Sequence, residues 1–201
     1  MTWKNSQGGY SQYGEDLILK EILSENGYFL EIGSFCPFIF SNTRFLVDRG
    51  WGGCYVDGCS FAIGRFIQEY KDNDKIKIVQ ALIGDADRFI KFYNSITDAI
   101  SSTDINHADK WKKSGSQFRE VYTVMISMNT LQTILPPVID FINIDVEGQS
   151  AYLSTLINYD QLQTKVVCIE HDNSIDMINS YMSKFNFTVH YTNATNIIYK
   201  R

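Results

Sequence analysis

The sequence has few of the features that define fibrous, membrane-spanning or disulfide-bonded proteins. Only three of its 201 residues are proline, and no run approaches the roughly 18 apolar residues that a spanning helix needs. Its cysteines, at positions 36, 54, 59 and 168, form no C-x-x-C pair, which predicts reduced core thiols. The first nine residues lack the apolar core of a signal peptide. We therefore expect a cytoplasmic protein without a membrane partner.

Basic charge is also scarce. The chain has 18 Lys and Arg residues against 23 Asp and Glu residues, a formal net charge of −5. Binding to a nucleic-acid backbone is driven by clustered basic residues, so the partner we expect is a small-molecule or glycan substrate and not a nucleic acid. With 44% hydrophobic and 20% charged residues, the chain has the composition and length of one globular domain.

The glycine-rich G-x-G-x-x-G loop of dinucleotide-binding sites is absent. The stretch 27–58 nevertheless reads as strand, turn, helix and strand, with Glu31 and Asp57 at the strand ends and Gly33 in the turn. In open α/β sheets ligands lie at the carboxyl ends of the strands, and an acid about 20 residues after the turn binds ribose hydroxyls. An acid ending the first strand suits a ligand with an ammonium and a sulfonium, such as S-adenosylmethionine. The alternative is that both acids merely end strands at the surface.

Apolar periodicity predicts alternating strands and helices and a mainly parallel sheet. Residues 1–26 form a helical segment of the same domain, and residues 27–201 form the rest, with an irregular, lid-like insertion near 84–120 that holds a short strand at 89–93 and a polar stretch at 97–106. The predicted strands are 27–31, 53–57, 76–83, 121–128, 138–144 and 165–169, with a closing hairpin at 187–191 and 197–199. The predicted helices are 17–23, 43–49, 61–70, 129–135, 149–159 and 175–185.

Six motifs in order across about residues 11–171 resemble the FkbM-type methyltransferases. They are Ser11-Gln12-Tyr13-Gly14-Glu15-Asp16, Phe29-Leu30-Glu31-Ile32-Gly33, Ser41-Asn42-Thr43, Gly50-Trp51-Gly52-Gly53, Tyr55-Val56-Asp57 and Ile142-Asn143-Ile144-Asp145-Val146-Glu147-Gly148. The resemblance implies a single-domain, Rossmann-like class I methyltransferase fold, a seven-stranded sheet with a C-terminal antiparallel hairpin. It also implies O-methylation of sugars or natural-product hydroxyls with S-adenosylmethionine. The sequence departs from the family pattern at Ser34-Phe35-Cys36-Pro37, at Gly58 and at Ser150.

The resemblance and the strand-end rule together predict the site residues. The predicted cofactor-binding residues are Glu31, Gly33, Ser34, Asn42, Thr43, Asp57, Gly58, Leu82 and Asp145. A hydroxyl is a weak nucleophile, so a positioned base is expected to assist its attack on the methyl carbon. We expect Asp145 to orient substrate or cofactor and either His171 or Glu147 to accept the proton, while His107 is expected on the surface or in a loop.

Several alternatives stay open at this point. A divalent metal ion held by Asp145, Glu147, Glu170 and Asp172 is chemically reasonable but is not favoured, so no metal ligand is assigned. A nicotinamide-dependent oxidoreductase could use a related sheet, although the missing glycine motif counts against it. A catalytically inactive binding module on the same fold is the third alternative.

Overall fold

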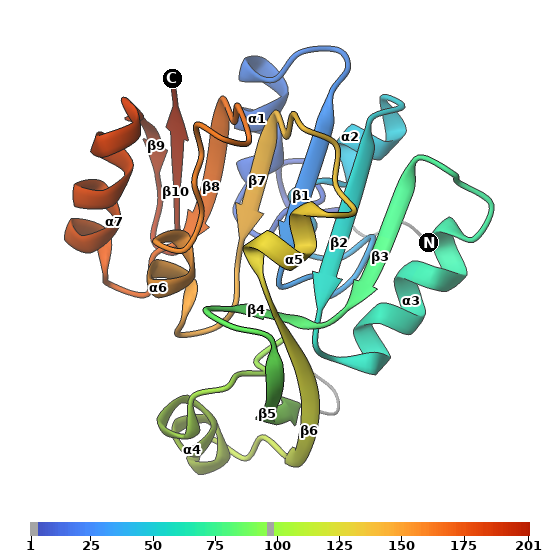
Figure 1. Ribbon diagram of the computed structural model, residues 1–201, viewed down its shortest axis with the longest axis vertical. Coiled ribbons are helices and arrows are strands. Elements are labelled where there is room, and N and C mark those ends of the chain that lie inside the picture. The colour runs from blue at the N-terminus through green and yellow to red at the C-terminus, as the bar shows by residue number, and fades with distance from the viewer. Residues whose placement is uncertain (1–3, 96–98) are drawn as a thin grey trace.

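A seven-stranded sheet forms the centre of the protein (Figure 1). The computed structural model describes residues 4–95 and 99–201. The first three residues of the start examined for a signal peptide, and residues 97 and 98 of the predicted polar stretch, lie outside the described residues. In the described part of the chain, the strand order is β3 (Ile76–Gln80), β2 (Gly52–Asp57), β1 (Tyr28–Ile32), β7 (Phe141–Ile144), β8 (Val166–Glu170), β10 (Asn196–Lys200) and β9 (Thr188–Thr192).

The direction of the strands confirms the predicted fold class. Each neighbouring pair from β3 to β8 is parallel, whereas β10 runs antiparallel to both β8 and β9. The C-terminal hairpin therefore supplies the antiparallel strand, as the sequence predicted. The carboxyl ends of the parallel strands all meet at one edge, the lower edge in Figure 1.

Helices cover both faces of this sheet because both faces are apolar. Side chains alternate along each strand, so Phe29 faces one layer and Leu30 faces the other. The Phe29 layer packs against α1 (Glu15–Ile22), α2 (Arg44–Asp48) and α3 (Ser60–Tyr70). The Leu30 layer packs against α5 (Met128–Gln132), α6 (Ser150–Ser154) and α7 (Ile175–Met182). Strands buried on both faces explain the continuous apolar runs in the sequence.

A second, smaller sheet replaces the irregular insertion that the sequence predicted. Its strand order is β4 (Leu82–Gly84), β6 (Phe118–Ser127) and β5 (Arg88–Ser95), and helix α4 (Ile105–Lys113) connects β5 to β6. We call these four elements, residues 82–127, the arm. The arm extends below the carboxyl edge of the main sheet (Figure 1). The strands predicted at 89–93 and 121–128 coincide with parts of β5 and β6. The irregular structure predicted around them was wrong at α4 and at the ends of β5 and β6, because these strands are largely exposed and mix charged with apolar residues, which hides their alternation.

Other element boundaries also differ from the prediction. The run 76–83 is not one strand: it splits at Ala81 into β3 in the main sheet and β4 in the arm. The helix predicted at 149–159 is limited to the five residues of α6, and the helix predicted at 175–185 ends at Met182, followed by the 3-10 turn Ser183–Phe185. The run 138–144 is paired only from Phe141 onward.

The remaining expectations concern cysteines and membrane spans. All four cysteines lie in the described part of the chain, and each is free and buried, which confirms the predicted core thiols. Among the helices of residues 4–95 and 99–201, none combines the length and the hydropathy that a bilayer crossing requires.

Candidate active site

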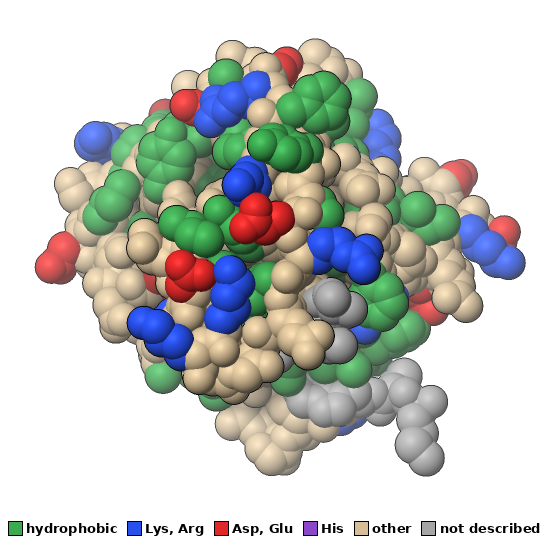
Figure 2. Space-filling view, turned by 90° about the horizontal axis from the view of Figure 1, so that it is seen from below, with side chains coloured by type: hydrophobic (Ala, Val, Ile, Leu, Met, Phe, Trp, Pro, Cys, Tyr) green, Lys and Arg blue, Asp and Glu red, His purple; other side chains and the backbone are tan. Residues whose placement is uncertain are grey.

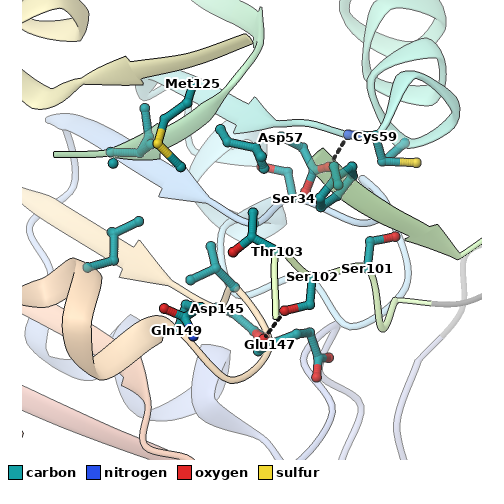
Figure 3. Close-up of a pocket in the computed structure, with 18 of the residues that line it drawn as sticks. Ser34, Asp57, Cys59, Ser101, Ser102, Thr103, Met125, Asp145, Glu147 and Gln149 are labelled. Carbon is teal, nitrogen blue, oxygen red and sulfur yellow. Dashed lines mark hydrogen bonds between the residues drawn. The ribbon is translucent and has the colours of Figure 1, made fainter. Parts of the chain in front are cut away.

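A pocket lies at the carboxyl edge of the main sheet, between the sheet and the arm (Figure 3). Its walls combine three kinds of residue. The sheet contributes a glycine turn and acids, the helix α3 and the arm contribute apolar side chains, and the arm adds hydroxyls. The lining residues used below are Gly33, Ser34, Asp57, Cys59, Ala62, Leu82, Phe92, Ser95, Ser101, Ser102, Thr103, Met125, Asp145, Glu147 and Gln149.

The turn after β1 passes so close to β7 that it excludes a side chain. Gly33 has a φ of +89°, and a Cβ added there would lie 1.6 Å from the backbone oxygen of Asp145. The backbone amide of Gly33 donates to the Val56 carbonyl at 2.9 Å. Only glycine adopts this positive φ without strain and also lacks the Cβ that would collide with Asp145. The close approach places Ser34, Asp57 and Asp145 on one continuous wall.

Asp57 ends β2 on this wall, as the strand-end rule predicted. Its Oδ1 accepts a hydrogen bond from the Cys59 amide at 2.6 Å (Figure 3). Burial raises the pKa of Asp57 to about 7, the charge of Asp145 raises it as well, and backbone hydrogen bonds from Cys59 and Ser34 partly offset the rise. The raised pKa shows that the protein supplies too few hydrogen-bond donors to stabilise the charged carboxylate of Asp57. A ligand with hydroxyl groups would supply the missing donors.

Asp145 follows β7 and belongs to a compact group of acids. Carboxyl oxygens of Asp145, Glu147 and Glu170 all lie within 4.8 Å of one another. Burial raises the pKa of Asp145 to about 6, and a hydrogen bond with Glu170 limits the rise. Burial and the neighbouring carboxylates hold the pKa of Glu170 well above its usual range. A proton shared between Asp145 and Glu170 thus relieves part of the repulsion between the carboxylates. The spacing of the three acids is also small enough for them to surround a cation.

An apolar wall lies next to Asp57. Cys59 and Ala62 of the α3 region pack with Phe92 of the arm, and Leu82 packs against this cluster. Leu82 lines the pocket as predicted, whereas Gly58 does not. A Cβ on Gly58 would lie 2.6 Å from a methyl carbon of Leu82. Gly58 therefore contributes by leaving room for the Leu82 side chain.

Three predicted cofactor residues lie behind the pocket. Strand alternation turns Glu31 to the α2 side of the sheet, where Thr43 Oγ1 donates to its carboxyl group and Tyr55 hydroxyl lies 3.1 Å from the same Thr43 oxygen. Asn42 donates to the side-chain oxygen of Asn143 at 3.0 Å. Burial raises the pKa of Glu31 to about 8, despite the hydrogen bond from Thr43. Glu31, Asn42 and Thr43 thus support β1 and β7 and are not among the lining residues.

The structure does not bring His171 to the pocket wall. The ring Nδ1 accepts from the Asn173 amide at 3.2 Å, which leaves the proton on Nε2, 3.3 Å from the Asn193 carbonyl. Because both ring nitrogens are engaged within neighbouring loops, His171 has the surroundings of a structural histidine. Of the predicted catalytic residues, Asp145 and Glu147 line the pocket.

Sequence reasoning missed the polar residues that the arm contributes. Ser95, Ser101 and Thr103 line the pocket, and Ser95 Oγ is buried without a hydrogen-bond partner among the described residues. His107 was expected on the surface or in a loop. Instead it lies on α4 with only 13% of its side chain exposed, against Glu147. The polar composition of residues 101–107 was visible in the sequence, but its placement depended on the undetected arm.

Comparisons with known proteins add little beyond the fold. No protein-family model matches the chain, and no curated protein matches it. Solved structures that match include the N-terminal domain of human METTL16 in complex with SAH, a second structure of the N-terminal domain of human METTL16, and the METTL16 MTase domain. The respective identities are 13, 12 and 11%, each with a TM-score of 0.48, covering 94, 93 and 92% of this chain and 67, 66 and 64% of those chains.

Proposed function

We propose that the protein is an S-adenosylmethionine-dependent methyltransferase that acts on a hydroxyl of a sugar, glycan or glycan-like small molecule. The observation that carries the proposal is the pocket wall formed by Gly33, Asp57 and Asp145 at the carboxyl edge of the sheet. The motif resemblance to FkbM-type methyltransferases supports the same conclusion, since its glycine turn and strand-end acids form this wall.

The residues present fit the cofactor. Asp57 offers a carboxyl group that lacks donors and would accept hydrogen bonds from the two ribose hydroxyls. The apolar wall of Cys59, Ala62 and Leu82 would pack against the adenine. The Gly33 turn and Asp145 would hold the methionine part, whose ammonium complements a carboxylate.

The arm supplies the features expected of an acceptor site. Ser101 and Thr103 of the arm present hydroxyls along the pocket, and Gln149 before α6 presents an amide (Figure 3). The arm residue Ser95 also lines the pocket, and together these groups match a hydroxyl-rich acceptor. In addition, the lower face of the molecule carries basic and acidic side chains interspersed among apolar ones (Figure 2). A mixed surface of this kind suits a neutral acceptor better than a polyanion.

Bound S-adenosylmethionine supplies an activated methyl group on a sulfonium. The protein then needs to align the acceptor oxygen and remove its proton. We assign Asp145 to orientation and Glu147 to proton acceptance, because both line the pocket and His171 does not. The apolar wall and the arm exclude water from the reacting groups.

Calorimetry with S-adenosylmethionine and S-adenosylhomocysteine tests the proposal. We expect both to bind, and Asp57→Ala to lower the affinity by about 30-fold, because losing hydrogen bonds to a charged group costs about 2 kcal/mol. Asp72→Ala, an exposed acid far from the pocket, is the matched control and should bind like the wild type. Release of S-adenosylhomocysteine in the presence of a panel of saccharides then tests the acceptor class. Absence of binding to the wild type would contradict the proposed function.

A further inference from the structure

Helix α4 of the arm places His107 against the loop that follows β7. His107 Nε2 lies 3.6 Å from Glu147 Oε2, and the exposed fractions of the two side chains are 13% and 20%. His107 Nδ1 also lies 3.5 Å from the position that a Cβ on Gly148 would occupy. The imidazole is thus the arm group that faces the Glu147 carboxylate among the described contacts, although it is about 40 residues away in the sequence.

The loop has an unusual backbone that the arm helps to hold. Glu147 has a φ of +47° and Gly148 a φ of +82°, and a non-glycine residue in this region carries strain that its surroundings must maintain. Ser102 Oγ of the arm donates to the Glu147 carbonyl at 2.8 Å (Figure 3). On the other side, the Gly148 amide donates to Asp172 Oδ2 at 2.9 Å. The Glu147 backbone is therefore fixed, and His107 faces its carboxylate.

The His107 ring is suited to donate a hydrogen bond. Its Nε2 is buried without a hydrogen-bond partner among the described residues. Burial lowers the pKa of His107 and Lys110 lowers it further, whereas the charges of Asp172 and Asp104 and a hydrogen bond to the Ile100 backbone oppose the change. A neutral imidazole carries one N–H, and with that proton on Nε2 the ring presents a donor to Glu147. A closure of about 0.4 Å would bring Nε2 within ordinary hydrogen-bond distance of the Glu147 carboxylate.

We propose that His107 is a positioning residue that donates its Nε2 proton to the Glu147 carboxylate and holds that carboxylate at the pocket wall. The arm would thereby supply the group that holds Glu147 in the loop after β7. The catalytic meaning of this contact rests on the proposed function, because it treats Glu147 as the proton acceptor. The coupling between the two side chains does not rest on it.

Titration of the histidine rings by NMR tests the coupling without any substrate. The chain has three histidines, so His107→Gln identifies the His107 signals by their loss. We expect Glu147→Gln to lower the titration midpoint of His107 by about one pH unit, because a nearby carboxylate stabilises the charged ring. The Glu147→Gln change should leave the signals of His190, which is exposed on β9, as they are in the wild type. The control variant Glu25→Gln should leave the His107 midpoint unchanged. An unchanged His107 midpoint in Glu147→Gln would overturn the inference.

Kinetics with an active acceptor separate positioning from a structural role. We expect His107→Leu to lower kcat by about tenfold while KM and S-adenosylhomocysteine affinity stay near the wild-type values, since positioning affects the chemical step. His107→Gln, which keeps an N–H donor, should recover most of the rate. Equal impairment of both variants would contradict the donor role. If the wild type neither binds the cofactor nor turns over, the proposed function fails, and the NMR titration still decides the coupling.

Discussion

At the scale of single residues, the pocket depends on Gly33. A methyl group at this position would meet the Asp145 backbone at 1.6 Å, and the φ of +89° disfavours any side chain. We expect Gly33→Ala to lower the free energy of unfolding by at least about 2 kcal/mol, because the β1 and β7 ends must separate. Urea unfolding measures the loss, and calorimetry should show weaker cofactor binding in the same variant.

Gly64 provides the matched control for this prediction. It lies inside helix α3, and a Cβ there would have no neighbour within 4 Å. Alanine favours a helix interior over glycine by about 0.8–1 kcal/mol, so Gly64→Ala should stabilise the protein slightly. Unchanged stability in Gly33→Ala would show that the β1 turn can move away from Asp145.

Residues at strand ends were predictable, whereas on the arm only Leu82 was predicted among the pocket-lining residues used here. Gly33, Asp57 and Asp145 follow buried apolar runs, and the carboxyl ends of parallel strands share one edge, so sequence alone placed them in the pocket. Glu31 lies near the end of β1, just before the Gly33 turn, but alternation turns its side chain away from the pocket, which a strand-end rule cannot detect without register. His107 has no local signal at all, because its partner Glu147 is brought to it by the tertiary fold.

At the scale of elements, the arm is attached to the main body through the Phe92 cluster. Phe92 of β5 is 3% exposed and packs with Cys59 and Ala62, whereas Phe89 on the same strand is 75% exposed. We expect Phe92→Ala to cost about 3 kcal/mol of stability, since it removes a buried aromatic ring. Phe89→Ala should change stability by less than about 0.5 kcal/mol. Thermal unfolding of the two variants measures the contrast, and similar losses would show that the arm is not anchored at Phe92.

The main sheet and the arm differ in how much of them the sequence predicted. Strands of the main sheet are buried on both faces, so uninterrupted apolar runs mark them clearly. All of β5 pairs with β6, but these strands are largely exposed, and their charged residues interrupt the pattern. Helix α4 is short and rich in lysine. Weak local signals combined with long-range pairing explain why only the segments 89–93 and 121–128 were predicted as strands and the rest of this region as irregular.

At the scale of the whole molecule, buried acids set the pH dependence of stability. Burial raises the pKa of Glu31 from 4.5 to about 8, of Asp57 to about 7 and of Asp145 to about 6. The unfolded chain releases these protons near pH 4 to 4.5. Between that pH and the raised pKa values, the folded chain therefore binds more protons than the unfolded chain. Stability without ligand should therefore fall as the pH rises from about 5 to about 8.

Glu31→Gln tests this prediction because an amide keeps the Thr43 contact and cannot ionise. We expect the variant to be more stable than the wild type by roughly 2 to 4 kcal/mol at pH 8, with a smaller difference at pH 5. Urea unfolding at both values measures the difference. Glu25→Gln, at an exposed position, should keep the wild-type dependence. Parallel pH profiles for the wild type and Glu31→Gln would contradict the raised pKa.

The position of β10 has a consequence for how the chain is made. β10 lies between β8 and β9 in the sheet, although it follows both of them in the sequence. During synthesis, β9 is therefore made before its neighbour β10, and until β10 is available one edge of β8 stays unpaired. Glu15 of α1 also lacks its hydrogen-bond donors until then, because Asn193 and Asn196 of this hairpin donate to its carboxylate. Translation must reach residue 200 before the sheet can close, so a nascent chain paused earlier would expose an apolar strand edge to chaperones.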